Sequence, residues 1–182
     1  MRRKEFIDII LNNISDKFDI YHNYWFKDKK FVIYAYCYNH NNKYDCAGES
    51  LKLWEAKSFE HLFFINRDNL DMQDFQSLMD FAIHEIEPHF VRGDGKNPVK
   101  HHLYSYISFI IITRNKPSKE VEQTIQNVQW AKNYKLSTKG YCELRVACVT
   151  PREYHVVSND CAKDIKDYLM DSLLHVEHYE DS

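Results

Sequence analysis

The segment from His84 to His102 carries the densest set of metal-binding side-chain types in this sequence. It contains four of the ten histidines of the chain, and Glu85, Glu87 and Asp94 stand among them. Imidazole and carboxylate groups are ligands that zinc takes in proteins. The spacing of these residues therefore decides whether the segment predicts a metal site.

Two histidines four residues apart share one helix face, which is the arrangement of zinc-protease helices. Here His84 and His89 are five residues apart, and Pro88 between them disfavours a continuing helix. We therefore interpret these side chains as surface histidines and expect no metal site and no cofactor. The alternative is a zinc site from His84, His89 and one of His101 and His102, because neighbouring strand residues point to opposite faces.

Glu55 and Lys57 form a second candidate pair, in the segment LWEAKSF. On a strand, residues i and i+2 share a face, so the carboxylate and the ammonium would point together. The spacing resembles the E-x-K half of the PD-(D/E)xK nucleases, in which acidic groups hold a divalent metal ion and the lysine helps to activate water. No Pro-Asp pair precedes it, since the first proline is Pro88, and the acidic partner would be Asp45 or Glu49 from a polar loop. We prefer an exposed ion pair.

The segment 102–113, HLYSYISFIIIT, is polar and aromatic at its start and apolar at its end. We expect His102, Tyr104 and Tyr106 to lie on one face, where rings with polar tips suit a small-molecule pocket or an interface. Arg145 on a later strand would supply a cation if the two strands are neighbours. The other interpretation is that these rings only cap the core.

Thirteen tyrosines mark the chain, and Tyr34, Tyr36 and Tyr38 alternate along one predicted strand. An aromatic sheet face can stack bases in proteins that bind single strands. Here no arginine or lysine accompanies the rings, so we prefer packing. The net charge of −3 and the lack of a basic stripe argue against duplex nucleic acid as a partner. The partner stays open, and a homo-oligomer is one candidate.

Hydrophobic periodicity predicts an α+β fold with a mostly antiparallel sheet and helices packed on it, in the order α-ββββ-α-β-α-ββ-α. The predicted helices cover residues 3–16 and 71–87, one segment that begins near Pro117, and one that begins near Asn159 or Asp160. The predicted strands cover residues 18–26, 30–39, 51–57, 59–66, 102–113, 140–150 and 154–158. We expect a turn at Lys57-Ser58, and one domain over residues 1–182 with a candidate subdomain break near 91–101.

Five cysteines, an odd number without C-x-x-C spacing, indicate free thiols rather than a disulfide framework or a zinc knuckle. The basic start MRRKEFIDIILNN is interrupted by Glu5, Asp8 and Asn12, so it lacks the apolar stretch of a secretion signal. The longest apolar run, ISFIII, which Ser108 interrupts, is too short to span a bilayer. These features predict a cytoplasmic protein that does not enter a membrane.

The segments HHLYSYISFIIIT and KNYKLSTKGYCELRVACV resemble small cytoplasmic proteins of an uncharacterised bacterial family, from Firmicutes. The shared pattern is a His-aliphatic-Tyr strand, a helix, and a K-x-Y…GY…R-V stretch that leads into a hairpin, over about the second half of the chain. The resemblance implies no activity and supplies no catalytic residues. We predict a non-enzymatic binding or protein-interaction domain. The alternative is a metal-dependent hydrolase of nuclease type that uses Glu55 and Lys57.

Overall fold

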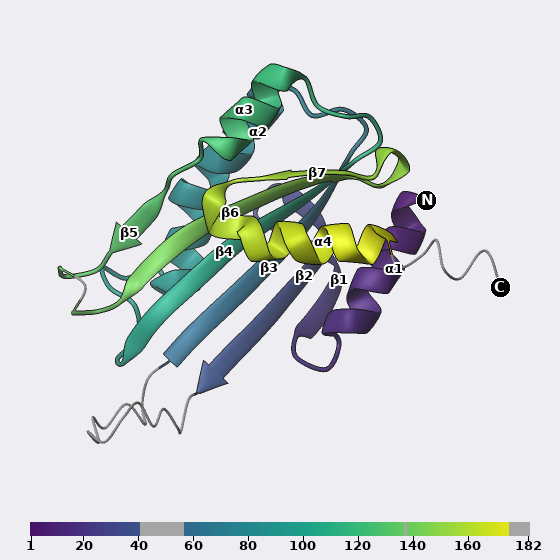
Figure 1. Ribbon diagram of the computed structural model, residues 1–182. Coiled ribbons are helices and arrows are strands. Elements are labelled where there is room, and N and C mark those ends of the chain that lie inside the picture. Colours follow the sequence, from purple (N-terminus) through teal and green to yellow (C-terminus); the bar gives the residue numbers. More distant parts are fainter. Residues whose placement is uncertain (41–56, 137, 175–182) are drawn as a thin grey trace, which may run out of the picture.

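The structure is a computed structural model that describes residues 1–40, 57–136 and 138–174 (Figure 1). The helices are α1 (Arg3–Ile14), α2 (Met72–Phe81), α3 (Lys119–Gln126) and α4 (Lys163–Leu174), with a π-helical segment η1 (Ala82–Val91) and the 3-10 turns η2 (Pro151–Glu153) and η3 (Asp160–Ala162). The strands are β1 (Asp19–Phe26), β2 (Lys29–His40), β3 (Lys57–Arg67), β4 (His102–Thr113), β5 (Ala131–Asn133), β6 (Tyr141–Thr150) and β7 (His155–Ser158). The predicted α+β class is confirmed. Among the described residues, no helix is both long and apolar enough to cross a membrane.

The strands form one mixed sheet in the order β1-β2-β3-β4-β6-β5, and β7 also pairs with β6. β1, β2 and β3 are antiparallel neighbours, as short hairpin connections require. β4 is parallel to both β3 and β6, because helical segments separate these strands in the sequence. The predicted hairpin between β6 and β7 is confirmed. β4 therefore lies inside the sheet, as its apolar end predicts.

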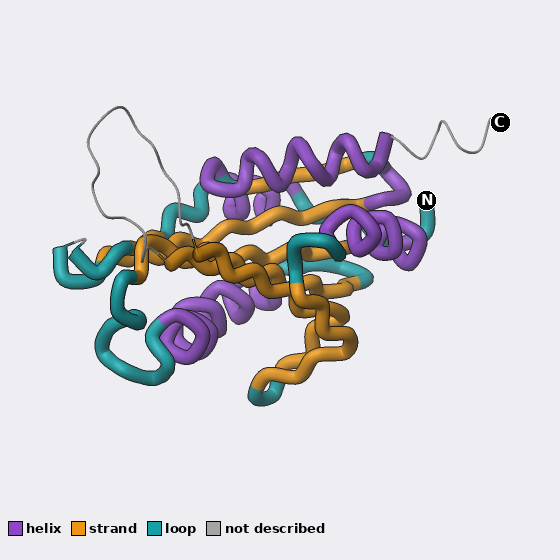
Figure 2. The backbone as a smooth tube through the Cα atoms, turned by 90° about the horizontal axis from the view of Figure 1, so that it is seen from below, coloured by secondary structure: helices purple, strands orange, loops and turns teal. Residues whose placement is uncertain are grey.

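Helices cover both faces of the sheet. Figure 2 shows α1 and α4 on one side of the strands and α2 on the other. On β4, Phe109 and Ile111 belong to the core that packs under α2 and α3, whereas Ile110 and Ile112 belong to the core under α1 and α4. The apolar run at the end of β4 follows from this arrangement, because a strand buried on both faces needs apolar residues at every position.

The helix after Asp71 begins as predicted but does not end at Pro88. The Asp71 carboxylate caps α2 by accepting a hydrogen bond of 2.8 Å from the amide of Asp74. After Phe81 the chain continues as η1, with Pro88 inside it. In an α-helix, a proline ring collides with the carbonyl four residues earlier, and the wider π-helical turn relieves that collision. The predicted helix end is thus wrong.

Three further differences concern short segments. The predicted turn at Lys57-Ser58 is wrong, because both residues lie in β3 and pair with the end of β2. The strand predicted over residues 51–57 lies outside the described residues except for Lys57. β5 was not predicted, because it spans only Ala131–Asn133 and is too short to show a period.

Candidate functional site

Tyr104, Tyr106 and Arg145 lie together on the face of the sheet that carries α1 and α4. The rings of Tyr104 and Tyr106 stack with centroids 4.6 Å apart. Arg145 on β6 places its guanidinium carbon 4.8 Å from the centroid of the Tyr106 ring, within range of a cation–π interaction. β4 and β6 are neighbours, so the condition that the sequence left open is met.

His102 lies on the opposite face, so the expectation of three rings on one face is wrong. His102 pairs with Lys57 of β3, but the next pair is Tyr104 with Ser58, and the register shifts there. Leu103 is the extra residue of this irregularity. An extra residue breaks the strict alternation of side chains and turns His102 away from Tyr104.

An apolar pocket of about 360 Å³ lies between α1 and α4 over the sheet. We call it the sheet pocket. Its apolar walls come from both helices and from the strands beneath them. Its polar lining residues are Glu60 of β3, Arg145 of β6, Asp164 and Tyr168 of α4, and Asn13 and Lys17 at the end of α1 and just after it. The lining residues are Ile10, Asn13, Ile14, Lys17, Phe18, Glu60, Leu62, Phe64, Ile110, Arg145, Asp164, Ile165 and Tyr168. The volume falls within the range of roughly 300–1,000 Å³ that is usual for small-molecule sites.

Arg145 is fixed at the polar end of the sheet pocket. Its Nε donates a hydrogen bond of 2.7 Å to the backbone oxygen of Cys161, and its Nη2 donates to the carboxylate of Asp164. The Arg145 side chain is only 7% exposed. Because it is held by α4, by the turn before α4 and by the ring of Tyr106, this cation has little freedom to move.

Glu60 and Ser108 supply polar groups without partners at the same place. Glu60 lines the sheet pocket and has no hydrogen-bond partner among the described residues. Burial raises the pKa of its carboxyl; Arg145 opposes this rise and Asp164 adds to it. Ser108 is fully buried and its Oγ has no partner in the described part of the chain. Ser108 pairs with Leu62 and Arg145, so it lies between two pocket residues on one face.

His102 and Ser105 have the geometry of a base and a nucleophile. The Nδ1 of His102 lies 3.0 Å from the carbonyl oxygen of Lys139, so this nitrogen must be the donor. Burial lowers the pKa of His102, opposed by that hydrogen bond, so the ring is neutral at pH 7. Its Nε2 then accepts the hydroxyl proton of Ser105 over 2.8 Å. Ser105 is completely buried, so we interpret the pair as a structural link.

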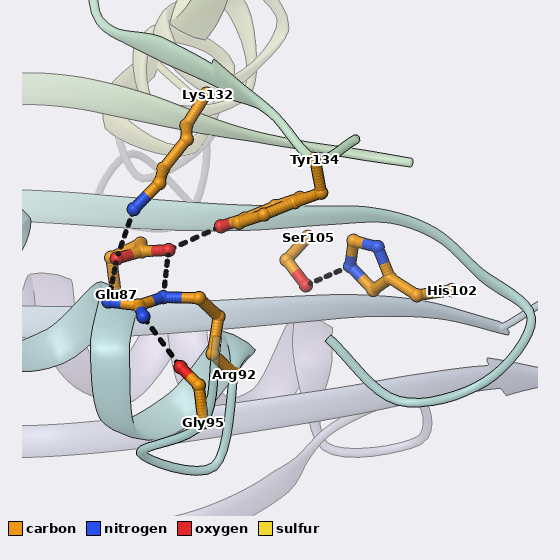
Figure 3. Close-up of polar contacts among 7 residues, drawn as sticks. All are labelled: Glu87, Arg92, Gly95, His102, Ser105, Lys132 and Tyr134. Atoms are coloured by element: carbon orange, nitrogen blue, oxygen red, sulfur yellow. Dashed lines mark hydrogen bonds and ion pairs between the residues drawn. The ribbon is translucent and has the colours of Figure 1, made fainter. Parts of the chain in front are cut away.

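A buried carboxylate holds the opposite face together (Figure 3). Glu87 of η1 is 1% exposed and accepts hydrogen bonds from Arg92 Nε at 2.8 Å, Arg92 Nη2 at 3.0 Å, Tyr134 Oη at 2.5 Å and Lys132 Nζ at 3.2 Å. Arg92 also donates to the carbonyl oxygen of Gly95. We call these four side chains, Glu87, Arg92, Lys132 and Tyr134, the Glu87 network. It ties η1 to β5 and to the turn after η1.

Burial raises the pKa of Glu87, but the hydrogen bonds from Arg92, Tyr134 and Lys132 outweigh burial and hold it below its ordinary value. Glu87 is therefore ionised at neutral pH. A carboxylate with four donors has little capacity left for a ligand. We assign the Glu87 network to stability rather than to binding.

The histidines of the opening segment bind different partners. His84 lines an open groove with Lys27 and Asp80. His89 forms an ion pair of 2.9 Å with Asp94, and His102 bonds Ser105. Within residues 1–40, 57–136 and 138–174, no three His, Cys, Asp or Glu side chains are grouped to hold a metal ion.

Only Lys57 of the candidate nuclease pair belongs to the described residues. Glu55 lies outside the described residues. Lys57 begins β3, and its backbone amide donates to the carbonyl oxygen of His101 over 2.9 Å. The pairing of Glu55 with Lys57 therefore stays a prediction.

Sequence reasoning missed Glu60, Ser108 and the Glu87 network. A signal for Ser108 was present, because it is a polar residue inside an otherwise apolar strand segment, whereas Glu60 stands among other polar residues. A buried polar group needs a reason to be there, and a ligand is one such reason. Glu87 gave no comparable signal, since its burial depends on η1.

Comparison with known proteins identifies a family but no activity. A protein-family model described as a domain of unknown function (DUF8052) matches residues 2–171. No curated protein and no solved structure matches the chain.

Proposed function

Since this chain belongs to the DUF8052 family of domains of unknown function, its role must be inferred from its own residues, and we propose that it is a small-molecule binding domain. The sheet pocket is the binding site in this proposal. Its ligand is amphipathic, with an apolar part between α1 and α4 and a polar head at Glu60. The proposal assigns the domain a binding role rather than a catalytic one.

The observation that carries the proposal is the pairing of apolar walls with unsatisfied polar groups. Burying a carboxylate or a hydroxyl without a hydrogen bond is costly, roughly 1–3 kcal/mol in proteins. The Ser108 hydroxyl is buried without such a bond within the described residues, and the half-buried Glu60 carboxylate also has none there; both lie on the side of the sheet that carries Arg145. A ligand in the sheet pocket could donate hydrogen bonds to Glu60, which lines it, beside the buried Ser108 hydroxyl.

The Glu60 carboxylate favours an ammonium head. Arg145 already bonds Asp164 and a backbone carbonyl, so the charges of Arg145 and Asp164 are paired with each other. Glu60 lines the pocket with no such partner in the described chain. An ammonium group beside Glu60 would favour its ionised form and make a charge-assisted hydrogen bond.

Calorimetric titration with n-octylamine, n-octanol and n-octanoate tests this proposal, because the three probes share a chain and differ in the head. We expect the amine to bind most tightly. Glu60→Gln should weaken amine binding about tenfold or more, since a hydrogen bond to a charged group is worth about 1.5–3 kcal/mol. Glu120→Gln, a matched change at an exposed residue of α3, should leave the affinity unchanged.

Two results would count against the proposal. One is the absence of binding for all three probes. The other is an amine affinity that is the same in the wild-type protein and in Glu60→Gln, which would place the amine elsewhere. Thermal unfolding of each variant would show whether it is folded before its affinity is compared.

The free thiols support a reducing location. Cys37, Cys142, Cys148 and Cys161 are unbridged, and Cys46 lies outside the described residues. Proteins with unpaired cysteines are typical of reducing compartments. A cytoplasmic, bacterial setting is part of the proposal on this ground and on that of the sequence resemblance.

A further inference from the structure

A second pocket, which shares no lining residue with the sheet pocket, is lined almost entirely by arginines. It has a volume of about 180 Å³, and its lining residues are Arg2, Arg3, Thr113, Arg114 and Arg152. We call it the arginine pocket. The printed sequence contains only seven arginines, so more than half of them meet here.

The fold explains why these residues meet. The parallel strands β4 and β6 end at the same edge of the sheet, at Thr113 and Thr150, whose hydroxyls are 2.7 Å apart. Arg114 follows β4, and Arg152 lies in η2, which follows β6. The start of α1 packs against η2, and Figure 1 shows the N-terminus beside the turn between β6 and β7. The carboxyl edge of parallel strands is a common place for ligands.

The charges of the arginine pocket are not balanced by the protein. Arg3 Nη2 bonds Asp68 at 2.7 Å, and Arg114 Nε lies 3.4 Å from the same carboxylate oxygen. Arg2 pairs with Glu5 at 3.8 Å. Two carboxylates therefore face four guanidinium groups.

Arg152 forms no hydrogen bond or ion pair with any other residue that the structure describes, and no carboxylate lines the pocket. The positive end of the α1 dipole adds to the same potential, because α1 begins at Arg3. Like charges held together in this way repel one another unless an anion lies between them. The pocket is thus built to favour an anion.

We propose that the arginine pocket binds the phosphate group of a small phosphorylated molecule or free phosphate. Guanidinium groups bind phosphate through two parallel N–H···O hydrogen bonds, and several of them can surround its oxygens. The volume is smaller than the roughly 300 Å³ at which pockets begin to enclose whole drug-sized ligands. It therefore suits a phosphate-sized group whose remaining part stays outside.

Calorimetric titration in a low-salt buffer with orthophosphate, pyrophosphate, glycerol phosphate and sulfate tests this inference. We expect binding either of orthophosphate and pyrophosphate or of the phosphate ester. Each affinity should fall as salt is added. Arg114→Gln and Arg152→Gln should each weaken binding about tenfold, the loss of one charge-assisted contact. Lys100→Gln, which removes one exposed positive charge elsewhere, should have no effect.

Comparing the inorganic phosphates with the ester also distinguishes free phosphate from a phosphorylated small molecule as the ligand. Binding of orthophosphate and pyrophosphate without the ester identifies free phosphate as the ligand, whereas tighter binding of the ester identifies a phosphorylated small molecule. The inference is overturned if none of the phosphates binds, if sulfate binds as tightly as they do, or if Arg114→Gln and Arg152→Gln bind like the wild-type protein. Because neither arginine lies in the sheet pocket, this outcome is independent of octylamine binding.

Discussion

Replacement of Glu87 with glutamine should destabilise the protein strongly at neutral pH. The carboxylate is 1% exposed and accepts four hydrogen bonds, three of them from cationic groups. Glutamine keeps the shape of the side chain but offers one acceptor oxygen and two donors in place of two acceptors. At least two of the four hydrogen bonds should therefore be lost.

The expected decrease in the free energy of unfolding depends on how exposed the hydrogen-bond partners of Glu87 are. Removing one member of a buried ion pair costs about 3–5 kcal/mol when the remaining charge stays buried. Here the Arg92 side chain is 19% exposed and that of Lys132 is 42% exposed, so both can regain water, whereas Tyr134 is buried. We therefore expect the low end, about 3 kcal/mol in the free energy of unfolding.

The pH dependence has a definite sign. The pKa of Glu87 is lower in the folded protein than its ordinary value of 4.5. A group with a depressed folded pKa stabilises the fold above its unfolded pKa, and this stabilisation is lost as the pH falls through the folded pKa. The difference between the wild-type protein and Glu87→Gln should thus be constant near neutrality and should shrink below about pH 4.5.

Urea unfolding followed by tryptophan fluorescence, at pH 7 and at several acidic pH values, measures both quantities. Glu85→Gln is a matched control, because Glu85 lies two residues earlier and pairs with Lys27 at a half-exposed position. That variant should lose less than about 1 kcal/mol. A Glu87→Gln variant as stable as the Glu85→Gln control, or one whose deficit persists unchanged in acid, would refute the role of the Glu87 network.

Three further predictions test separate features. Gly140→Ala should lower the free energy of unfolding by about 3 kcal/mol, because the residue has φ +75° and a Cβ would lie 2.3 Å from a backbone oxygen. Gly93→Ala, at φ +56° in open space, should lower it by only about 1 kcal/mol. Equal melting temperatures of the two variants would disprove this. Thiol titration should count five thiols in the unfolded protein, and Cys142 and Cys148 should react slowly in the native protein, since burial raises the pKa of both thiols; a count of three would reveal a bridge. His61 should show no titration by NMR between pH 5 and pH 8 (a window of about three units around the usual value), because burial lowers its pKa to about 3, and an inflection near 6.5 would contradict its burial.

Local patterns predicted the fold well where one element decides its own structure. The start of α1 and the Asp71 cap follow from short-range spacing and capping chemistry. The apolar end of β4 predicted a strand inside the sheet, and it is buried on both faces. These features need no knowledge of distant residues.

The errors arose where the local signal was overridden. Pro88 predicts a helix end, but the chain accommodates it in a π-helical turn, which brings Glu87 into the interior. His102 should share a face with Tyr104, but the irregularity at Leu103 reverses it. A single residue added to a strand changes the direction of every side chain on one side of it.

The candidate site could be predicted only in part. Tyr104, Tyr106 and Arg145 were identified from ring chemistry and charge, and the adjacency of β4 and β6 brings them together. The pocket beside them could not be foreseen, since it forms between α1 and α4, which are more than one hundred residues apart in the sequence. Its polar residue Glu60 gains meaning only from that packing.

Methyl NMR of the isoleucine-labelled protein, titrated with n-octylamine, tests the central claim most directly. Ile110 and Ile165 line the sheet pocket, whereas Ile125 is buried on the opposite face of the sheet. Ligand binding in the sheet pocket predicts saturable shifts of the Ile110 and Ile165 methyl signals, an unchanged Ile125 signal, and weaker saturation in Glu60→Gln. Absence of shifts at Ile110 and Ile165, or shifts of equal size at Ile125, would contradict the assignment of this pocket as the binding site.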